Sequence, residues 1–176
     1  MTEPNVILVN ERDEACGTME KMEAHRQGLL HRAFSVFIFD SKGRMLLQQR
    51  AAGKYHGGLL WTNACCSHPY PGEDTAAAAT RRLREELGFS APLEDIFSFT
   101  YRAEVENGLV EHEFDHVFAG VYEGPIDANP QEVEAHAYEE METIGRGLRD
   151  EPGRYTTWFR LAFPRIESWW KERYGS

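Results

Sequence analysis

Residues 73–89 read EDTAAAATRRLREELGF, and the fold class follows from this stretch and the segments around it. Apolar side chains recur at positions 76, 79, 83 and 87, which is the spacing of one helix face. Asp74 stands where a helix N-cap is favoured, and Gly88 stands where glycine ends helices in the left-handed conformation. The pattern predicts a helix over residues 74–87.

Strand patterns lie on both sides of this helix. Residues 33–50 (AFSVFIFDSKGRMLLQQR) hold two β-rich runs around an Asp-Ser-Lys-Gly turn, which predicts a hairpin with one well-buried strand. Residues 98–105 and 110–122 read as two further strands, the second with clean alternation of polar and apolar side chains.

The C-terminal third predicts a short strand near residues 135–138, a short helix, and a final helix over residues 156–174. We expect Pro164 to bend that helix. One stripe of the helix is apolar and consists of Trp158, Ala162, Ile166 and Trp169. The order of elements predicts an α+β or mixed α/β fold class.

Composition restricts the function. A chain of 176 residues with 41% hydrophobic content predicts a single domain over residues 1–176. The net charge of −10 argues against nucleic-acid and membrane partners, which usually require a broad basic face. Three cysteines, Cys16, Cys65 and Cys66, do not make a disulfide framework, and the N-terminal apolar run is too short for a secretory signal. We therefore expect a cytoplasmic protein.

Histidine and glutamate side chains offer a metal set. The segment KMEAHRQGLLHR contributes two histidines, WTNACCSHPY contributes a third, and the alternating strand projects two glutamates from one face. Together these residues form a plausible set of three nitrogen and two oxygen ligands: His25, His31, His68, Glu111 and Glu113. Taken singly, each is more often a surface or hydrogen-bonded side chain, and that interpretation stays for His56, His112, His116 and His136.

The helix predicted over residues 74–87 also belongs to a recognisable sequence motif. Glu73, seven residues and RRLREELGF resemble a degenerate Nudix box, with Ser67 in place of its first glycine and Arg82 in place of a metal-binding glutamate. With GLLHRAFSVFIF, WTNACCSHP, TYRAE and EHEFDHVF in this order, residues 5–172 resemble the type I isopentenyl-diphosphate isomerases. The resemblance implies a Nudix-type β-sheet core flanked by helices.

Site roles follow from that resemblance, residue by residue. It implies acid-base chemistry by Cys66 and Glu113, with Tyr101 supporting the glutamate. We expect cations near Cys66 to give it thiolate character. The resemblance implies that the histidine–glutamate set binds one divalent ion tightly, Mn²⁺ or Zn²⁺, while Glu86 binds Mg²⁺ that arrives with the diphosphate. The residues expected to contact the substrate are Lys21, Arg50, Lys54, Arg82 and Trp158.

Two other functions remain open from the sequence. A Nudix diphosphohydrolase would need the box glutamates that activate water, and Arg82 replaces one of them. A binding module with a structural zinc ion and no catalysis would need four ligands and no open coordination position. The expected partner is a small-molecule diphosphate, and the expected state is a monomer or a homodimer.

Overall fold

The computed structural model describes residues 4–175 and has the mixed α+β architecture predicted from the sequence. Nine strands of the described chain join one sheet, and four α-helices pack around it. The strands are β1 Asn5–Val9, β2 Ala15–Glu20, β3 His31–Phe39, β4 Met45–Arg50, β5 Trp61–Thr62, β6 Cys65–Ser67, β7 Glu94–Glu104, β8 Val110–Val121 and β9 Val133–Glu139. The helices are α1 Lys21–Gln27, α2 Thr75–Leu87, α3 Met141–Asp150 and α4 Thr157–Tyr174, with short 3-10 turns at Glu106–Gly108 and Pro152–Arg154.

Strand β3 is the centre of the sheet. It pairs in parallel with β8 along its whole length, from His31 opposite Glu113 to Phe39 opposite Val121. It also pairs antiparallel with β6 and, at one position each, with β1 and β4. Strand β7 pairs antiparallel with β8, and β9 pairs antiparallel with β4.

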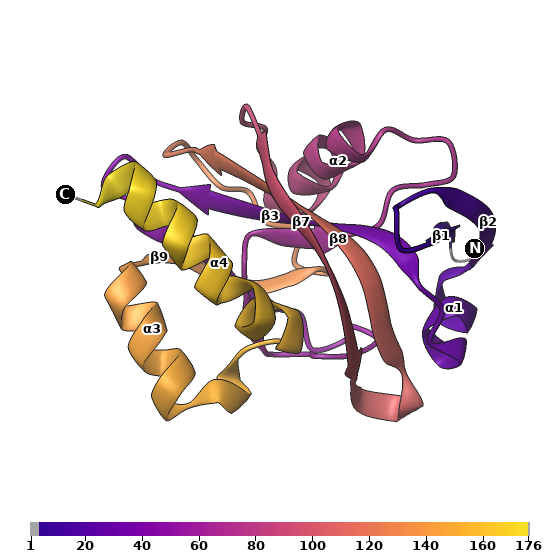
Figure 1. Cartoon of the computed structure of the whole chain (residues 1–176). Coiled ribbons are helices and arrows are strands. Elements are labelled where there is room, and N and C mark those ends of the chain that lie inside the picture. Colours follow the sequence, from indigo (N-terminus) through magenta and orange to yellow (C-terminus); the bar gives the residue numbers. More distant parts are fainter. Residues whose placement is uncertain (1–3, 176) are drawn as a thin grey trace.

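Helices cover both faces of the sheet (Figure 1). On one face, α2 packs against alternate residues of β3 such as Phe34 and Val36. On the other face, α3 and α4 pack against the intervening residues, such as Phe37 and Phe39. A strand buried on both sides reads as a nearly continuous apolar run, as the sequence of β3 does.

Most predicted elements are confirmed. Helix α2 begins after Asp74, whose side chain accepts from the amide of Ala77 at 3.0 Å, and ends at Gly88 with φ of 75°. A β-carbon at Gly88 would lie 2.5 Å from the Asp127 carbonyl oxygen, so both the backbone angle and the space require glycine there. Strands β7, β8 and β9 and helix α4 overlap their predicted ranges, and α4 continues through Pro164.

The predicted hairpin over residues 33–50 is confirmed at its turn, but the two strands then diverge. Only Phe39 and Met45 are paired between β3 and β4, because β3 takes β8 and β6 as its long neighbours while β4 takes β9 and β5. The hairpin of β1 and β2, helix α1 and the short strands β5 and β6 were not predicted, since each of these segments is too short to show a clear period.

Where β3 and β8 begin, α3 and α4 do not cover the face of the sheet that they cover elsewhere. Odd-numbered residues of both strands point to the α4 face, and the first of them, His31 and Glu111, lie beyond the apolar residues that α4 covers. Among residues 4–175, no helix is long and apolar enough to cross a membrane.

Candidate active site

Three histidines and two glutamates meet where β3 and β8 begin. His25 comes from α1, His31 from β3, His68 from the residue after β6, and Glu111 and Glu113 from β8. One ligand atom from each of the five lies within 4.8 Å of the others, and four of the five residues are buried while His68 is half-buried. The set predicted from the sequence is therefore brought together by four separate segments.

Backbone hydrogen bonds orient two of the imidazoles. The Nδ1 atom of His25 donates to the Lys21 carbonyl at 2.7 Å, and Nδ1 of His31 donates to the Leu29 carbonyl at 2.8 Å. With Nδ1 as the donor, the neutral form of each ring has a lone pair on Nε2 that is directed into the cluster. Metal-binding histidines are usually fixed by such a second hydrogen bond, so the donor set fits a divalent ion with nitrogen and oxygen ligands.

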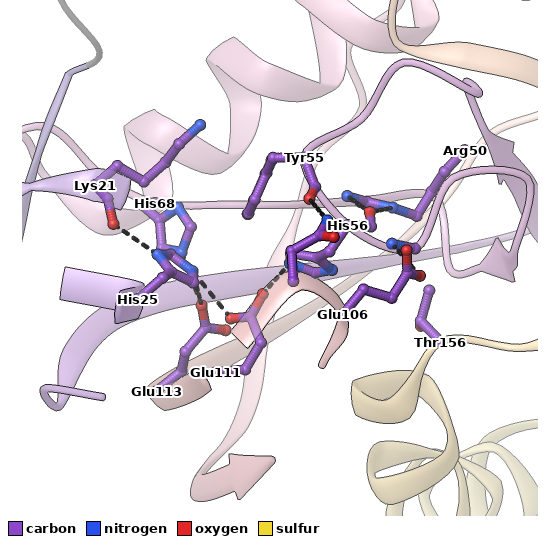
Figure 2. A network of polar contacts seen from close by, with 12 residues as sticks. Lys21, His25, Arg50, Tyr55, His56, His68, Glu106, Glu111, Glu113 and Thr156 are labelled. Atoms are coloured by element: carbon purple, nitrogen blue, oxygen red, sulfur yellow. Dashed lines mark hydrogen bonds and ion pairs between the residues drawn. The ribbon is translucent and has the colours of Figure 1, made fainter. Parts of the chain in front are cut away.

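The carboxylates face the imidazoles across the cluster. Glu113 Oε2 lies 3.1 Å from His31 Nε2 and 2.8 Å from His68 Nε2. Glu111 Oε2 lies 3.3 Å from His25 Nε2 (Figure 2). Two buried carboxylates this close to one another are costly unless positive charge compensates them. An ion at the centre of the cluster would supply that charge.

Charge and burial shift the histidine pKa values in opposite directions. Burial lowers the pKa of His25, but its hydrogen bond to Glu111 and the charges of Glu111 and Glu113 outweigh burial and raise it to about 9. Burial lowers the pKa of His68 to about 4, because its attraction to Glu113 is the smaller effect. In the metal-free protein at neutral pH, His25 is therefore the positively charged imidazolium, with a proton on each ring nitrogen, and His68 is the neutral imidazole.

Tyr101 holds the second oxygen of Glu113. The phenol donates to Glu113 Oε1 at 2.6 Å, and the antiparallel register of β7 and β8 places the two residues directly opposite one another. Tyr101 is 7% exposed and Glu113 is 6% exposed. The two oxygens of Glu113 thus have different surroundings, Oε2 facing imidazoles and Oε1 facing the phenol.

Cys66 lies across a narrow pocket from this glutamate. Strand β6 pairs with β3 and places the thiol 3.2 Å from Asn63 Oδ1 and 3.5 Å from Ser35 Oγ. The pocket has a volume of about 20 Å³, the room of roughly one water molecule. Its lining includes Cys66, Glu113, Tyr101, Arg50 and Trp158.

The expected thiolate character of Cys66 is not borne out. Burial raises the pKa of the Cys66 thiol, and the nearby carboxylate of Asp115 raises it further. The hydrogen bonds to Ser35 and Asn63 and the charge of Arg50 act in the other direction but are weaker. The sequence reasoning placed cations near the thiol but did not include the cost of burying a charge there. Cys66 is therefore a neutral thiol in this structure.

The predicted basic residues line one larger cleft beside the pocket. Lys21, Arg50, Lys54 and Arg82 all border a cleft of about 570 Å³, which also reaches Cys66 and His68. Lys54 and Arg82 share Glu132 as an ion-pair partner. Arg81, which was not predicted, borders the same cleft and is paired with Glu73 at 2.8 Å.

Glu86 lies apart from the histidine cluster, on α2. It is 4% exposed, accepts from the Cys65 thiol at 3.0 Å and lies 3.3 Å from the guanidinium of Arg82. The two metal positions predicted from the sequence are thus separate places in the structure. The role of Glu86 in binding Mg²⁺ stays a prediction.

Two polar residues near the site, His56 and Asp115, were given no site role by sequence reasoning. His56, which was expected to be a surface or hydrogen-bonded side chain, is 2% exposed and in ion-pair contact with Glu111, so it is a buried neighbour of the cluster. Asp115, on the face of β8 that carries the two glutamates, accepts from Ser35 at 2.7 Å. The alternation of β8 already pointed to Asp115, whereas a loop residue such as His56 has no period that would reveal it.

Known proteins resemble this chain over most of its length. A NUDIX domain matches residues 29–159. The chain is 49% identical over 166 residues to the isopentenyl-diphosphate Delta-isomerase of Pectobacterium atrosepticum, covering 94% of this chain and 93% of that protein. It is 51% identical over 154 residues to the isopentenyl-diphosphate Delta-isomerase of Serratia proteamaculans, covering 88% and 86%. The chain belongs to the Nudix-type isopentenyl-diphosphate Delta-isomerases.

Solved structures agree on the fold of this isomerase-family chain. A crystal structure from Deinococcus radiodurans matches with a TM-score of 0.76 at 20% identity, covering 92% of this chain and 98% of that one. A MutT Nudix hydrolase from Burkholderia pseudomallei matches with a TM-score of 0.62 at 19% identity, covering 78% and 98%. At such identities the likeness concerns the Nudix fold alone, and the isomerase relatives carry the family assignment.

Proposed function

We propose that this chain interconverts isopentenyl diphosphate and dimethylallyl diphosphate. The observation that carries the proposal is that Cys66 and Glu113 line one narrow pocket, from strands on either side of β3. The near full-length likeness to proteins named isopentenyl-diphosphate Delta-isomerase supports it.

The reaction requires an acid and a base close together. Moving the double bond means adding a proton to one carbon of an unactivated alkene and removing a proton from another. Both groups must reach the reacting carbons, and water must be kept from the cationic species that forms between the two transfers. A thiol and a carboxyl group in a pocket with room for about one water meet these demands.

The surroundings of Glu113 suit a group that exchanges protons. Tyr101 fixes Oε1, while Oε2 points to the cluster formed by the three histidines and Glu111. A tightly bound Mn²⁺ or Zn²⁺ would offset the buried negative charge and set the proton affinity of Glu113. Without the ion, burial raises the pKa of Glu113, but His68 and His31 outweigh burial and lower it well below its usual range.

Trp158 would shield and stabilise the hydrocarbon part of the substrate. Its ring lines the pocket, and the guanidinium of Arg50 lies 5.1 Å from the ring centroid. An indole face attracts cations, so a developing positive charge in the pocket is favoured there. Since the pocket holds about 20 Å³, we expect its side chains to move when a five-carbon tail enters.

The basic cleft would bind the diphosphate. Lys21, Arg50, Lys54 and Arg82 are its predicted contacts, and they give an acidic chain a local region of positive charge. Mg²⁺ bound to the diphosphate would be held by Glu86 on α2. The identity of each ion, the oligomeric state and the cytoplasmic location remain predictions.

Hydrolysis is the less favoured reaction. Arg82 takes the place of one box glutamate and is itself paired with Glu85 at 2.8 Å and with Glu86 at 3.3 Å. A cation at this position removes one metal ligand and neutralises part of the charge of the remaining box glutamates.

One assay separates the two reactions. Purified protein supplied with Mg²⁺ and either Mn²⁺ or Zn²⁺ is incubated with isopentenyl diphosphate, and the products are followed by NMR in D₂O. We expect dimethylallyl diphosphate that carries deuterium in the methyl group created at the protonated carbon. Release of phosphate without isomerised product, or full turnover without solvent label, would reject the proposal.

A further inference from the structure

His56 is a buried side chain that contacts the predicted metal set from outside. It lies in the loop between β4 and β5 and is 2% exposed. Its Nε2 atom is in ion-pair contact with Glu111 Oε1 and is fully buried (Figure 2). Within residues 4–175 that nitrogen makes no hydrogen bond, and the Glu111 carboxylate oxygen is the polar atom it is in ion-pair contact with.

The two oxygens of Glu111 are therefore used differently. Oε2 faces His25 Nε2 at 3.3 Å, inside the cluster, whereas Oε1 faces His56. His56 is not among the residues whose ligand atoms lie within 4.8 Å of one another. Its position is that of an outer partner, which fixes the orientation of a ligand without binding the ion itself.

The same imidazole also packs against Trp158. The two rings meet edge to face, with centroids 5.6 Å apart and planes at 84°. Trp158 lines the reaction pocket, but His56 lines a neighbouring cavity with Glu106, Leu60 and Thr156. Because His56 does not border the pocket of Cys66 and Glu113, it can act on the reaction only through the residues it touches.

The backbone of His56 holds a third part of the site. Its carbonyl oxygen accepts from Arg50 Nε at 3.3 Å and from the terminal nitrogen of the same guanidinium at 3.0 Å. This contact belongs to the main chain, so a change of the His56 side chain leaves the atoms that make it in place. A substitution of the His56 side chain can thus disturb Glu111 while the backbone contact to Arg50, a predicted diphosphate-binding residue, is kept.

We infer that His56 is a positioning residue of the metal centre, which holds Glu111 Oε1 so that Oε2 is presented to the divalent ion. The inference rests on the proposed metal centre and deepens it. The imidazole meets Glu111 Oε1 through Nε2, so we expect a side chain that places an N–H at the same point to replace it and one that lacks a polar hydrogen there to fail.

Two substitutions test this role. His56→Phe keeps a planar ring beside Trp158 but has no donor, whereas His56→Gln keeps an N–H near the position of Nε2. We expect His56→Phe to weaken Mn²⁺ or Zn²⁺ binding by about 10- to 100-fold, as loss of an outer partner typically does, and His56→Gln to bind nearly as tightly as the wild type. The measurement is the dissociation constant of the ion, by competition with a chelator.

Controls separate positioning from folding. His136→Phe makes the same chemical change at an exposed histidine of β9 and should leave metal binding unchanged. At saturating metal, His56→Phe should regain most of its kcat, with a KM for isopentenyl diphosphate near the wild-type value. If His56→Phe does not fold, His56→Met carries the same expectation.

The possible results separate a wrong role for His56 from a wrong metal centre. Wild-type affinity in His56→Phe, or equal losses in His56→Phe and His56→Gln, would overturn the role of His56 alone. A wild-type protein that binds neither Mn²⁺ nor Zn²⁺ would overturn the proposed metal centre, and the inference with it.

Discussion

Adjacent cysteines in a strand point to opposite faces, and this separates Cys65 from Cys66. Cys65 is fully buried against α2 and donates to Glu86 at 3.0 Å. Cys66 faces the pocket that Glu113 also lines. A displacement of one residue along the chain thus moves the thiol from the core to the candidate reaction site.

Replacing each cysteine tests this assignment. We expect Cys66→Ala to lower kcat by about 10²- to 10⁴-fold, the usual effect of losing an acid-base group. Cys65→Ala should keep most of the activity and cost about 1 kcal/mol of folding free energy, since a small buried side chain is lost. The measurements are steady-state isomerisation and urea unfolding of both variants. Similar activity in the two would show that Cys66 is not the acid-base cysteine.

His25 gives the metal-free protein a distinct pH dependence. Its pKa rises from 6.5 to about 9 on folding, so its contribution to stability is complete below pH 6.5 and is lost as pH approaches 9. His68 is neutral in the folded protein over this range, because its folded pKa is about 4, and in the unfolded chain it also becomes neutral as the pH rises above its ordinary value of 6.5. We expect the free energy of unfolding of metal-free protein to fall between pH 6.5 and 9, and to fall less steeply in His25→Gln.

Metal affinity should change in the opposite direction over the same range. The ion must displace the proton from His25, so affinity should rise about tenfold per pH unit up to pH 9 if that single proton is released. Chelator competition at pH 7, 8 and 9 measures this slope. An affinity independent of pH would mean that His25 is not a ligand.

Among the helices and strands, those with a regular hydrophobic period could be predicted from the sequence. Helix α2 has a capped 3.6-residue repeat and β8 alternates with period two, so their buried faces could be predicted from sequence. The long parallel pairing of β3 with β8 could not, because residues about 80 apart carry no local mark of their register. The residue types offered the ligand set and the resemblance to a family gave it a role, whereas the contact of His56 and the burial of Cys66 required the structure.

The predicted metal ligands lie in two places, the cluster beside β8 and Glu86 on α2. We therefore predict two separable metal requirements. His68 belongs to the cluster beside β8, while Glu86 lies on α2 next to Arg82. We expect His68→Ala to lower the metal content of purified protein. We expect Glu86→Gln to leave that content near normal and to raise the Mg²⁺ concentration needed for half-maximal turnover.

Elemental analysis and Mg²⁺ titration of activity measure the two effects. Glu73→Gln is a useful control, because Glu73 lies just before α2 and is paired with Arg81 rather than with the cluster. A loss of tight metal in Glu86→Gln, or unchanged metal content in His68→Ala, would refute the division of ligands.

The whole molecule has apolar cores that do not depend on the metal cluster. Phe34, Val36 and Leu83 belong to the core under α2, and Phe37 and Phe159 belong to the core under α4. The histidines and glutamates of the cluster lie at one end of β3 and β8, beside these cores. Removing an ion from that end leaves most of the buried apolar surface intact, and with it the main source of stability.

Removal of the metal should therefore lower stability without unfolding the chain. An ion present at about 100 times its dissociation constant adds about 2.7 kcal/mol to the free energy of unfolding, and for a chain of this size that corresponds to about 5–10 °C in Tm. We expect chelation to lower Tm by about this amount and to abolish isomerisation, while near-UV circular dichroism stays native-like at 25 °C. A non-catalytic zinc module would behave differently, because its folding free energy comes from the ion and chelation would unfold it. Loss of the near-UV signal on chelation, regained when metal is added back, would favour that module over the isomerase.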